Sequence, residues 1–314
     1  MGNWYGSRRS NHDVHCSHHR CWCLSNLLYK EKGGIGKMIN IKRSISKTFL
    51  YIAMTIYSLS ILIPLFVMMM TSFKTNAEIF KNPFGLPSSF NLDAYINLFV
   101  ISNYGKYFLN SIGVTVLSLA LAVTMSALAA YAISKYKFKY NRAIYVYFVV
   151  GLVVPIKLGT IDIMITMLRL SIFDTLWALI IVYIAMAIPL SVFVLYDYIR
   201  MVPEELSSAG RIDGCSEPGI FARIIVPLIK PGLAAAGIIS FIPNWNEFWF
   251  PLVLIKSREN YTIPLATGQL FGQFDTKLDL VFAVLSLASI PVIIIYLLLS
   301  NYFVKGLSAG AVKG

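Results

Sequence analysis

The sequence predicts an all-α polytopic membrane protein with six transmembrane helices and both termini on the cytoplasmic side. Of its 314 residues 57% are hydrophobic and 13% are charged, whereas soluble domains carry roughly 25% charged residues. Apolar runs recur at lengths near the ~20 residues that an α-helix needs to cross a hydrocarbon core of ~30 Å. The Lys and Arg side chains fall mainly in short segments between these runs. These observations favour a lipid bilayer as the surroundings of the chain.

Six apolar runs are long enough to form transmembrane helices. The first contains no charged residue and holds Pro64, which a membrane helix tolerates. It is longer than the h-region of a cleaved signal peptide, which has about 7 to 15 residues. The third run reaches Pro155 and Lys157 too early to cross, so we expect its helix to continue past the proline. The expected spans are Phe49–Met70, Phe108–Ala132, a span that starts at Ala143, Leu176–Tyr196, Leu233–Leu254 and Leu280–Phe303.

The distribution of positive charge gives the orientation of these spans. Segments on the side of the two termini hold 19 Lys and Arg residues, against 8 in the three loops on the other side. The link 135–142 contributes four of the 19 and has no acidic residue. The excess of positive charge predicts that both termini and the segment 197–232 are cytoplasmic.

These assignments divide the chain into three regions. Met38 opens a basic stretch that leads directly into the first span, so we expect residues 1–37 to be disordered or not native to the functional protein. The regions are a cytoplasmic N-terminal segment, 1–47, a six-helix membrane domain, 48–305, with its cytoplasmic loop 197–232, and a C-terminal tail, 306–314.

We expect neither a cofactor nor a metal ion. The N-terminal segment gathers three cysteines and all four histidines, but they lack the paired spacing of a structural zinc site. A metal-binding cluster is the alternative there. The formal charge of +12 does not indicate a nucleic-acid partner, because it belongs to short links between apolar runs.

The loop between the fourth and fifth spans carries the most informative residues. Pro203 followed by two glutamates is a favourable helix start, because proline lacks only an N–H that has no partner there and the acids complement the helix dipole. Gly214 can stop this helix in a left-handed conformation, and Ser216 can cap a second helix that Pro227 ends. The loop is therefore expected to form two short helices joined at a turn.

Both expected helices have an apolar face. Leu206, Ala209 and Ile212 lie along one side of the first, and Phe221 and Ile224 lie along one side of the second. Helices this short are not stable alone, so each needs a surface on which to bury its apolar face. A partner protein is one candidate, and the ends of the chain's own membrane helices are the other.

The same loop resembles the EAA motif of binding-protein-dependent ABC importer permeases. That motif reads E-A-A, three residues, G, nine residues and then I-x-L-P. Ala209, Gly214, Ile224 and Pro227 stand at the matching positions with the expected spacing.

Three positions depart from the motif. Ser208 replaces its usual glutamate, Gly210 its second alanine and Val226 its leucine. The serine cannot form a salt bridge, and Glu205, one helical turn earlier, is the candidate to substitute for it.

Further segments are similar to the carbohydrate class of these permeases, the maltose type. They are 107–111 at the start of the second span, 245–248 in the fifth span and 306–307 with 310–314 at the C-terminus. The resemblance covers residues 47–314.

The resemblance implies the permease subunit of a carbohydrate ABC importer, which is not itself an enzyme. The implied partners are a cytoplasmic ABC ATPase dimer, a second permease subunit in a heterodimer and an extracytoplasmic sugar-binding protein. The loop would sit in a cleft of the ATPase, and the geometry of its turn would matter more than any charge. The implied coupling residues are Glu205, Leu206, Ser208, Ala209, Gly210, Ile212, Asp213, Gly214, Phe221, Ile224 and Pro227.

Polar residues inside the fifth span are candidates for the substrate path, because polar side chains are costly within a membrane. Flanking prolines, Pro243 and Pro251, can unwind the helix there. The alternative is that the tryptophan lies in an interfacial aromatic belt and that the polar residues fasten one helix to another. The candidates are Asn244, Trp245, Asn246 and Glu247.

Two other classes of protein are less consistent with the sequence. An ion-coupled secondary transporter is the alternative function, but the sequence shows no inverted repeat and no paired intramembrane acids. A membrane enzyme needs clustered His, Asp or Cys within the spans, whereas all four histidines lie in the N-terminal segment. The sequence contains no G-x-x-x-x-G-K-[ST] motif, so ATP hydrolysis must come from another chain.

Overall fold

The computed structural model describes residues 47–100, 103–271 and 277–311, with side chains described up to residue 298 apart from 270–276. All regular structure within these residues is helical. The cysteines and histidines of the N-terminal segment, and with them the alternative of a metal-binding cluster, lie outside the described residues.

Four of the described helices are long and apolar enough to cross a membrane. The first runs through Pro64 without a break, as its composition predicts. Two bent helix pairs would raise the number of candidate spans to six if each pair formed one span. The four long helices are Lys47–Thr71, α4 (Tyr104–Lys135), α7 (Leu176–Arg200) and α14 (Leu278–Ala311).

The third expected span is broken at its proline. Helix α5 (Asn141–Val153) stops before Pro155, and a 3-10 helix (Ile156–Gly159) leads into α6 (Thr160–Arg169) at a bend of 82°. The expectation of a helix that continues past the proline was therefore wrong. A proline disfavours helical geometry in the residue before it, and Val154 is extended, with φ −71° and ψ 120°.

The fifth expected span is interrupted between its two prolines. Helix α11 (Lys230–Trp245) contains Pro243 and ends two residues later, and α12 (Trp249–Leu254) contains Pro251. The expected unwinding is confirmed, and it affects residues 246–248.

Shorter helices connect the long ones. In the loop after α7 they are α8 (Glu204–Ile212), α9 (Glu217–Ile220), a π-helical turn (Phe221–Ile225) and α10 (Val226–Leu228), which meets α11 at a bend of 76°. Elsewhere they are α2 (Asn76–Lys81), α3 (Asp93–Val100), a 3-10 helix (Arg258–Asn260) and α13 (Ile263–Phe271).

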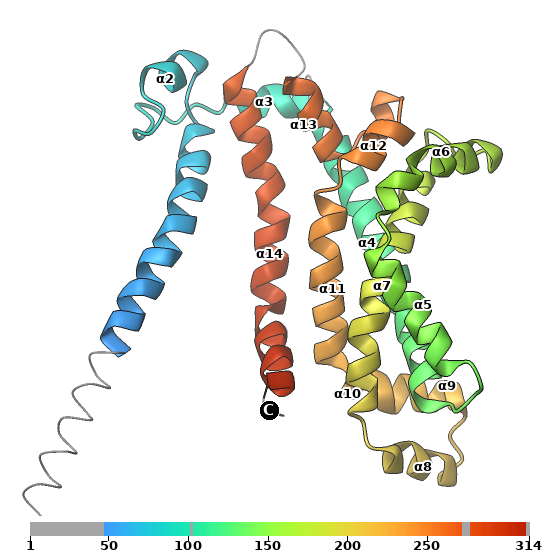
Figure 1. Ribbon diagram of the computed structural model, residues 1–314. Helices are drawn as coiled ribbons and strands as arrows, with labels where there is room; N and C mark the ends of the chain where they lie inside the picture. Colours follow the sequence, from blue (N-terminus) through green and yellow to red (C-terminus); the bar gives the residue numbers. More distant parts are fainter. Residues whose placement is uncertain (1–46, 101–102, 272–276, 312–314) are drawn as a thin grey trace, which may run out of the picture. The chain divides into compact units, whose positions relative to one another are not determined.

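Helices α4 and α7 pack along each other, and α11 contacts both of them as well as α14 (Figure 1). The side of α4 that is buried in this packing is rich in small residues, among them Ser118, Ala122, Ser126 and Ala130. Small side chains let helix backbones approach closely where the hydrophobic effect cannot drive association. The hydroxyl of Ser126 donates to the carbonyl of Ile188 on α7 at 3.4 Å.

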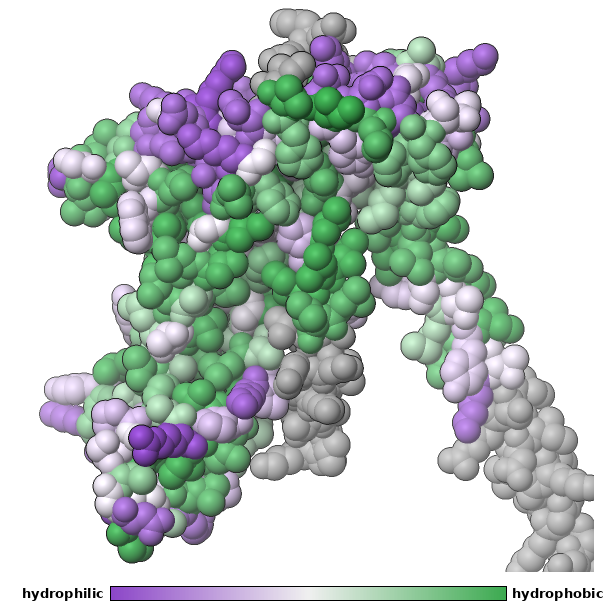
Figure 2. All heavy atoms as spheres, turned by 180° about the vertical axis from the view of Figure 1, so that it is seen from behind, coloured by the Kyte–Doolittle hydropathy of each residue, from purple (hydrophilic) through white to green (hydrophobic). Residues whose placement is uncertain are grey.

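The surface of the unit 67–314 matches a bilayer. On its face shown in Figure 2, the described apolar residues form a broad band, and hydrophilic residues gather above and below it. Many large apolar side chains are exposed, for example Leu109, Val116 and Trp177. Soluble monomers rarely expose apolar surface on this scale, so the band is suited to contact with lipid and with other membrane helices.

Candidate functional site

The loop after α7 contains the two short helices joined at a turn that the sequence predicts. Helix α8 begins directly after Pro203, and the chain reverses at Gly214, whose φ of +80° lies in the left-handed region. The N–H of Cys215 donates to the carbonyl of Gly210 at 2.9 Å, which closes the end of α8. Ser216 occupies the residue before α9, although its side chain makes no capping bond there.

The second helix is longer than predicted. It continues from Glu217 through the π-helical turn to Leu228, so Pro227 lies inside its last turn and does not end it. In the π-helical turn the N–H of Val226 bonds to the carbonyl of Phe221, one residue farther back than in an α-helix. This wider turn makes room for Pro227, whose ring would crowd a regular turn and which has no N–H to donate.

One side of α8 packs on the second helix. Ser207 and Gly210 are buried. A Cβ atom on Gly210 would lie 2.8 Å from Cδ1 of Ile224 and 3.3 Å from Cγ1 of Ile220. The missing side chain at position 210 therefore sets how closely the two helices approach.

The opposite side of α8 is open. Glu205, Ser208, Ala209 and Ile212 follow the i, i+3, i+4, i+7 spacing of one helix face, and all are exposed. Ile212 is 86% exposed, and the neighbouring Leu206 is 41% exposed. Asp213 extends this exposed surface. The predicted apolar face of the first helix is thus uncovered in the single chain.

The second helix, in contrast, packs on the chain's own membrane helices. Phe221 and Ile224 belong to the cluster that Ile220 and Ile225 form with Leu195 of α7 and with alanines of α4. The chain's own membrane helices therefore cover the apolar face of the second helix, whereas the apolar face of the first helix stays uncovered in the single chain.

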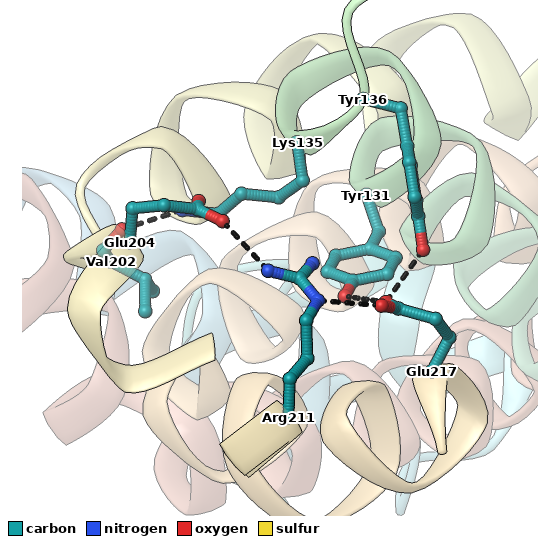
Figure 3. A network of polar contacts seen from close by, with 7 residues as sticks. All are labelled: Tyr131, Lys135, Tyr136, Val202, Glu204, Arg211 and Glu217. Carbon is teal, nitrogen blue, oxygen red and sulfur yellow. Dashed lines mark hydrogen bonds and ion pairs between the residues drawn. The ribbon is translucent and has the colours of Figure 1, made fainter. Parts of the chain in front are cut away.

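A network of charged and tyrosine side chains joins the loop to the end of α4 (Figure 3). Glu217 lies at its centre. Its Oε1 accepts a hydrogen bond from Nε of Arg211 at 2.7 Å, and its Oε2 accepts from the hydroxyls of Tyr136 at 2.6 Å and Tyr131 at 3.2 Å. The carboxylate of Glu217 therefore accepts hydrogen bonds both from α8 and from the end of α4.

Glu204 makes the second half of the network. Its carboxylate lies 3.4 Å from Nη1 of Arg211 and 3.4 Å from Nζ of Lys135. Lys135 is nearly buried, with a side chain that is 6% exposed, and it also donates to the carbonyl of Val202 at 2.6 Å. The end of α4 is thereby fastened to both ends of the segment 202–217.

The hydrogen bonds of the network stabilise the protonated forms of Arg211 and Tyr136. Hydrogen bonds to Glu217 and then to Glu204 raise the pKa of Arg211 above its ordinary value. The hydrogen bond to Glu217 also raises the pKa of Tyr136, because an ionised tyrosine could not donate to a carboxylate. Arg211 stays positive and Tyr136 stays a donor throughout the neutral range.

The contacts of this network were not predicted from the sequence, where Glu204 was expected only to start a helix. A usable signal existed, since Arg211 and Glu217 stand three residues on either side of Gly214, where a tight turn brings opposite charges together. The partners on α4 could not be found in this way, because they are distant in the sequence.

The substrate-path candidates lie at the break between α11 and α12, where the first of them, Asn244, is buried. It lies beside Ser111, Tyr183 and Thr262 in a narrow gap that has no room for a water molecule. Nδ2 of Asn244 and the hydroxyl of Thr262 have no hydrogen-bond partner among the described residues. Asn244 is thus the candidate whose side-chain N–H donor is unpaired within the described residues.

The other three candidates take part in contacts within the chain. Trp245 is buried, stacks on Phe241, and donates from Nε1 to the carbonyl of Ala288 on α14 at 3.1 Å. Asn246 is exposed, and its Nδ2 donates to the carbonyl of Ile242 at 2.9 Å.

Glu247 caps the start of α12. Its Oε1 accepts the N–H groups of Trp249 at 2.8 Å and Phe250 at 3.2 Å, and its Oε2 lies 3.6 Å from Nζ of Lys157. These bonds fix the geometry of the helix break.

Comparison with known proteins agrees with this architecture. Residues 122–309 match the model of the family described as binding-protein-dependent transport system inner membrane component. The chain is 33% identical to the probable ABC transporter permease protein YurM of Bacillus subtilis (strain 168), over 86% of this chain and 90% of that protein. It is 31% identical to the arabinooligosaccharides transport system permease protein AraQ of Halalkalibacterium halodurans, over 80% of this chain and 91% of the relative.

A solved structure has the same fold. It is the crystal structure of a bacterial ABC transporter involved in the import of the acidic polysaccharide alginate. One of its chains matches with a TM-score of 0.69 and 23% identity, over 82% of this chain and 96% of that chain. From the family match and the identity to YurM, this chain belongs to the family of binding-protein-dependent transport system inner membrane components, which are multi-pass membrane proteins.

Proposed function

We propose that this chain is the membrane-spanning permease subunit of an ATP-binding-cassette importer that takes up a carbohydrate. Family membership supports the transporter class. The relative AraQ is named for arabinooligosaccharides, and the solved transporter imports alginate; both substrates are carbohydrates. ATP hydrolysis is the task of a separate ATPase subunit.

The exposed face of α8 is the observation that carries the proposal. Ala209 and Ile212 form an apolar stripe on a helix whose buried side, at Ser207 and Gly210, packs on the second helix. A cleft in a cytoplasmic ATPase dimer is the proposed cover of this stripe. Within the described residues Glu205 makes no ion pair. Its carboxylate is therefore the proposed partner of a basic group on the ATPase, in place of the glutamate that Ser208 replaces.

The proposed topology has six crossings with both termini and the 203–227 loop in the cytoplasm. The bent pair α5–α6 supplies the third crossing, and α11 with α12 supplies the fifth. Apolar residues left exposed in the single chain are available to a second permease subunit, with which this chain would form a heterodimeric pore. A related crystal structure contains an alginate pentasaccharide-bound periplasmic protein, which supports an extracytoplasmic sugar-binding protein as a further partner.

The break between α11 and α12 is the proposed edge of the substrate path. Nδ2 of Asn244 has no partner within the part of the chain that the structure describes, and Asn246 is exposed beside it. Trp245 and Glu247 would contribute by holding the break open, since their polar groups already have partners within the chain.

Purification from native membranes in mild detergent tests the proposal. We expect an ATPase subunit to co-purify with the tagged chain and to be lost from the Gly214→Trp variant. Uptake of a panel of labelled oligosaccharides, in cells with and without this chain, then identifies the substrate. A chain that purifies alone and drives uptake from an ion gradient would instead support a secondary transporter.

A further inference from the structure

We propose that the side chains around Glu217 are a mechanical clamp, which transmits the displacement of the α8–α9 turn to helix α4. The clamp consists of Tyr131, Lys135, Tyr136, Glu204, Arg211 and Glu217 (Figure 3). The inference rests on the proposed function, since it assigns positioning residues to the coupling loop.

The clamp lies on a different side of α8 from the exposed stripe. Glu204 and Arg211 are seven residues apart and so share one helix face, while Ala209 and Ile212 occupy another. An ATPase bound to the stripe would leave the clamp intact. Binding and transmission are therefore carried by different residues and can be separated by substitution.

Bond geometry gives the clamp its stiffness. An exposed ion pair of two flexible side chains contributes little on its own. Here Glu217 accepts from three donors, at 2.6, 2.7 and 3.2 Å, and two of these come from the end of α4. The ring of Tyr131 also packs on Phe221, with centroids 5.2 Å apart. Such charge-assisted bonds from several directions fix the carboxylate in position.

The clamp acts on a helix that can spread a displacement through the membrane domain. Helix α4 packs along α7 and contacts α11, and it runs from Lys135 at the clamp to Tyr104 at its other end. Asn110 near that other end donates to the carbonyls of Glu259 at 2.8 Å and Tyr261 at 3.0 Å, in the segment after α12. A rigid α4 thus connects the coupling loop with the far side of the chain.

The decisive experiment compares uptake with ATP hydrolysis in the complex purified from native membranes and reconstituted into liposomes. Glu217→Gln removes the charge while it keeps the shape of the side chain. We expect the variant to retain the ATPase subunit and its hydrolysis within about twofold, while uptake falls about tenfold, because charge-assisted hydrogen bonds are lost. The matched control is Asp93→Asn, which removes an exposed carboxylate on α3 that makes no ion pair within the described residues, and we expect it to leave both readouts unchanged.

Further variants guard against a simple folding defect. The double variant Tyr131→Phe, Tyr136→Phe removes two hydroxyl donors without changing charge, and we expect it to reduce uptake relative to hydrolysis. The variant Arg211→Lys keeps a positive charge beside Glu204 and Glu217, so we expect it to retain more uptake than Arg211→Gln.

Three outcomes would overturn the clamp. They are normal uptake in both the Glu217→Gln and the double phenylalanine variants, a loss of uptake that only follows the loss of the ATPase subunit, and equal uptake in Arg211→Lys and Arg211→Gln. Absence of an ATPase subunit from the wild-type preparation is a different result, because it refutes the proposed function itself.

Discussion

A Cβ atom on Gly210 would lie 2.8 Å from Cδ1 of Ile224, closer than such atoms pack in proteins. This contact joins the helix that presents the exposed stripe to the helix that is anchored on α4 and α7. The absence of a side chain at position 210 therefore lets Ile224 pack directly against α8.

Enlarging residue 210 should displace α8. Gly210→Leu places a side chain where Ile220 and Ile224 already lie, and overpacking of this kind typically costs about 1–3 kcal/mol. We expect less ATPase subunit in the purified complex and at least tenfold less uptake. Gly210→Ala is the matched control, since rotation of the Ile224 side chain makes room for one methyl group. Equal uptake by the leucine and alanine variants would contradict this packing.

Position 214 tests the backbone of the turn. Within the described residues, no heavy atom beyond the two flanking residues lies within 4 Å of a Cβ built on Gly214, but its φ of +80° disfavours any L-residue by roughly 1–2 kcal/mol. Gly214→Ala should thus reduce uptake several-fold although there is space for the methyl group. Gly214→Asn should be milder, because asparagine tolerates the left-handed region. The order glycine, asparagine, alanine in uptake assays is the predicted result, and alanine equal to glycine would refute it.

Glu247 is predicted to stabilise the break between α11 and α12. Glu247→Ala leaves the N–H groups of Trp249 and Phe250 without an acceptor, which costs about 1–3 kcal/mol for a buried group. Glu247→Gln keeps the accepting oxygen and loses only the ion pair with the exposed Lys157, so its effect should be small. Thermal unfolding in detergent measures both. Loss of uptake in Glu247→Gln at unchanged stability would instead indicate contact with the substrate.

Asp174 gives a prediction on pH. Its carboxylate accepts the N–H groups of Lys256 at 2.7 Å and Ser257 at 2.8 Å and the hydroxyl of Ser257 at 2.5 Å. Burial acts to raise the pKa of Asp174, but these bonds outweigh it and hold the pKa below the ordinary 3.8.

A lowered carboxyl pKa stabilises the folded chain above the ordinary value, and the contribution disappears as pH falls through the lowered one. Asp174→Asn should therefore be less stable than the wild type by a constant amount from neutral pH down to about pH 4. The difference should shrink below that, and thermal unfolding across this range checks it. Asparagine suits the φ of +61° at this position, so the backbone is not strained by the change. A difference that grows as the pH falls would contradict the assigned hydrogen bonds.

The sequence predicted the elements that depend on local chemistry. Pro203 and Gly214 bound α8 as expected, because a helix start and a left-handed turn are properties of single residues. The long helices that can cross a membrane were likewise predicted, because the length of an apolar run is a local property of the sequence. The prediction that the third helix continues past Pro155 was wrong, because a proline in a membrane helix can either bend or end it, and packing decides which.

The contacts between distant segments could not be predicted. The apolar pattern predicted a face on both helices of the loop but not what covers each face. Phe221 of the second helix packs on the chain, whereas Ile212 of the first is exposed. Likewise the hydrogen bond from Tyr136 to Glu217 joins residues 81 positions apart, and no short-range spacing encodes it. Such pairs follow only from the packing of α4 on the loop.

The most direct test of the central claim is the side of the membrane on which Ala209 lies and what covers it. A cysteine at position 209, in a background without the chain's four native cysteines, can be labelled with a membrane-impermeant maleimide. We predict labelling in inside-out vesicles stripped of the ATPase subunit, protection when that subunit is bound, and no labelling in intact cells. Labelling from outside intact cells would contradict the coupling role of the loop.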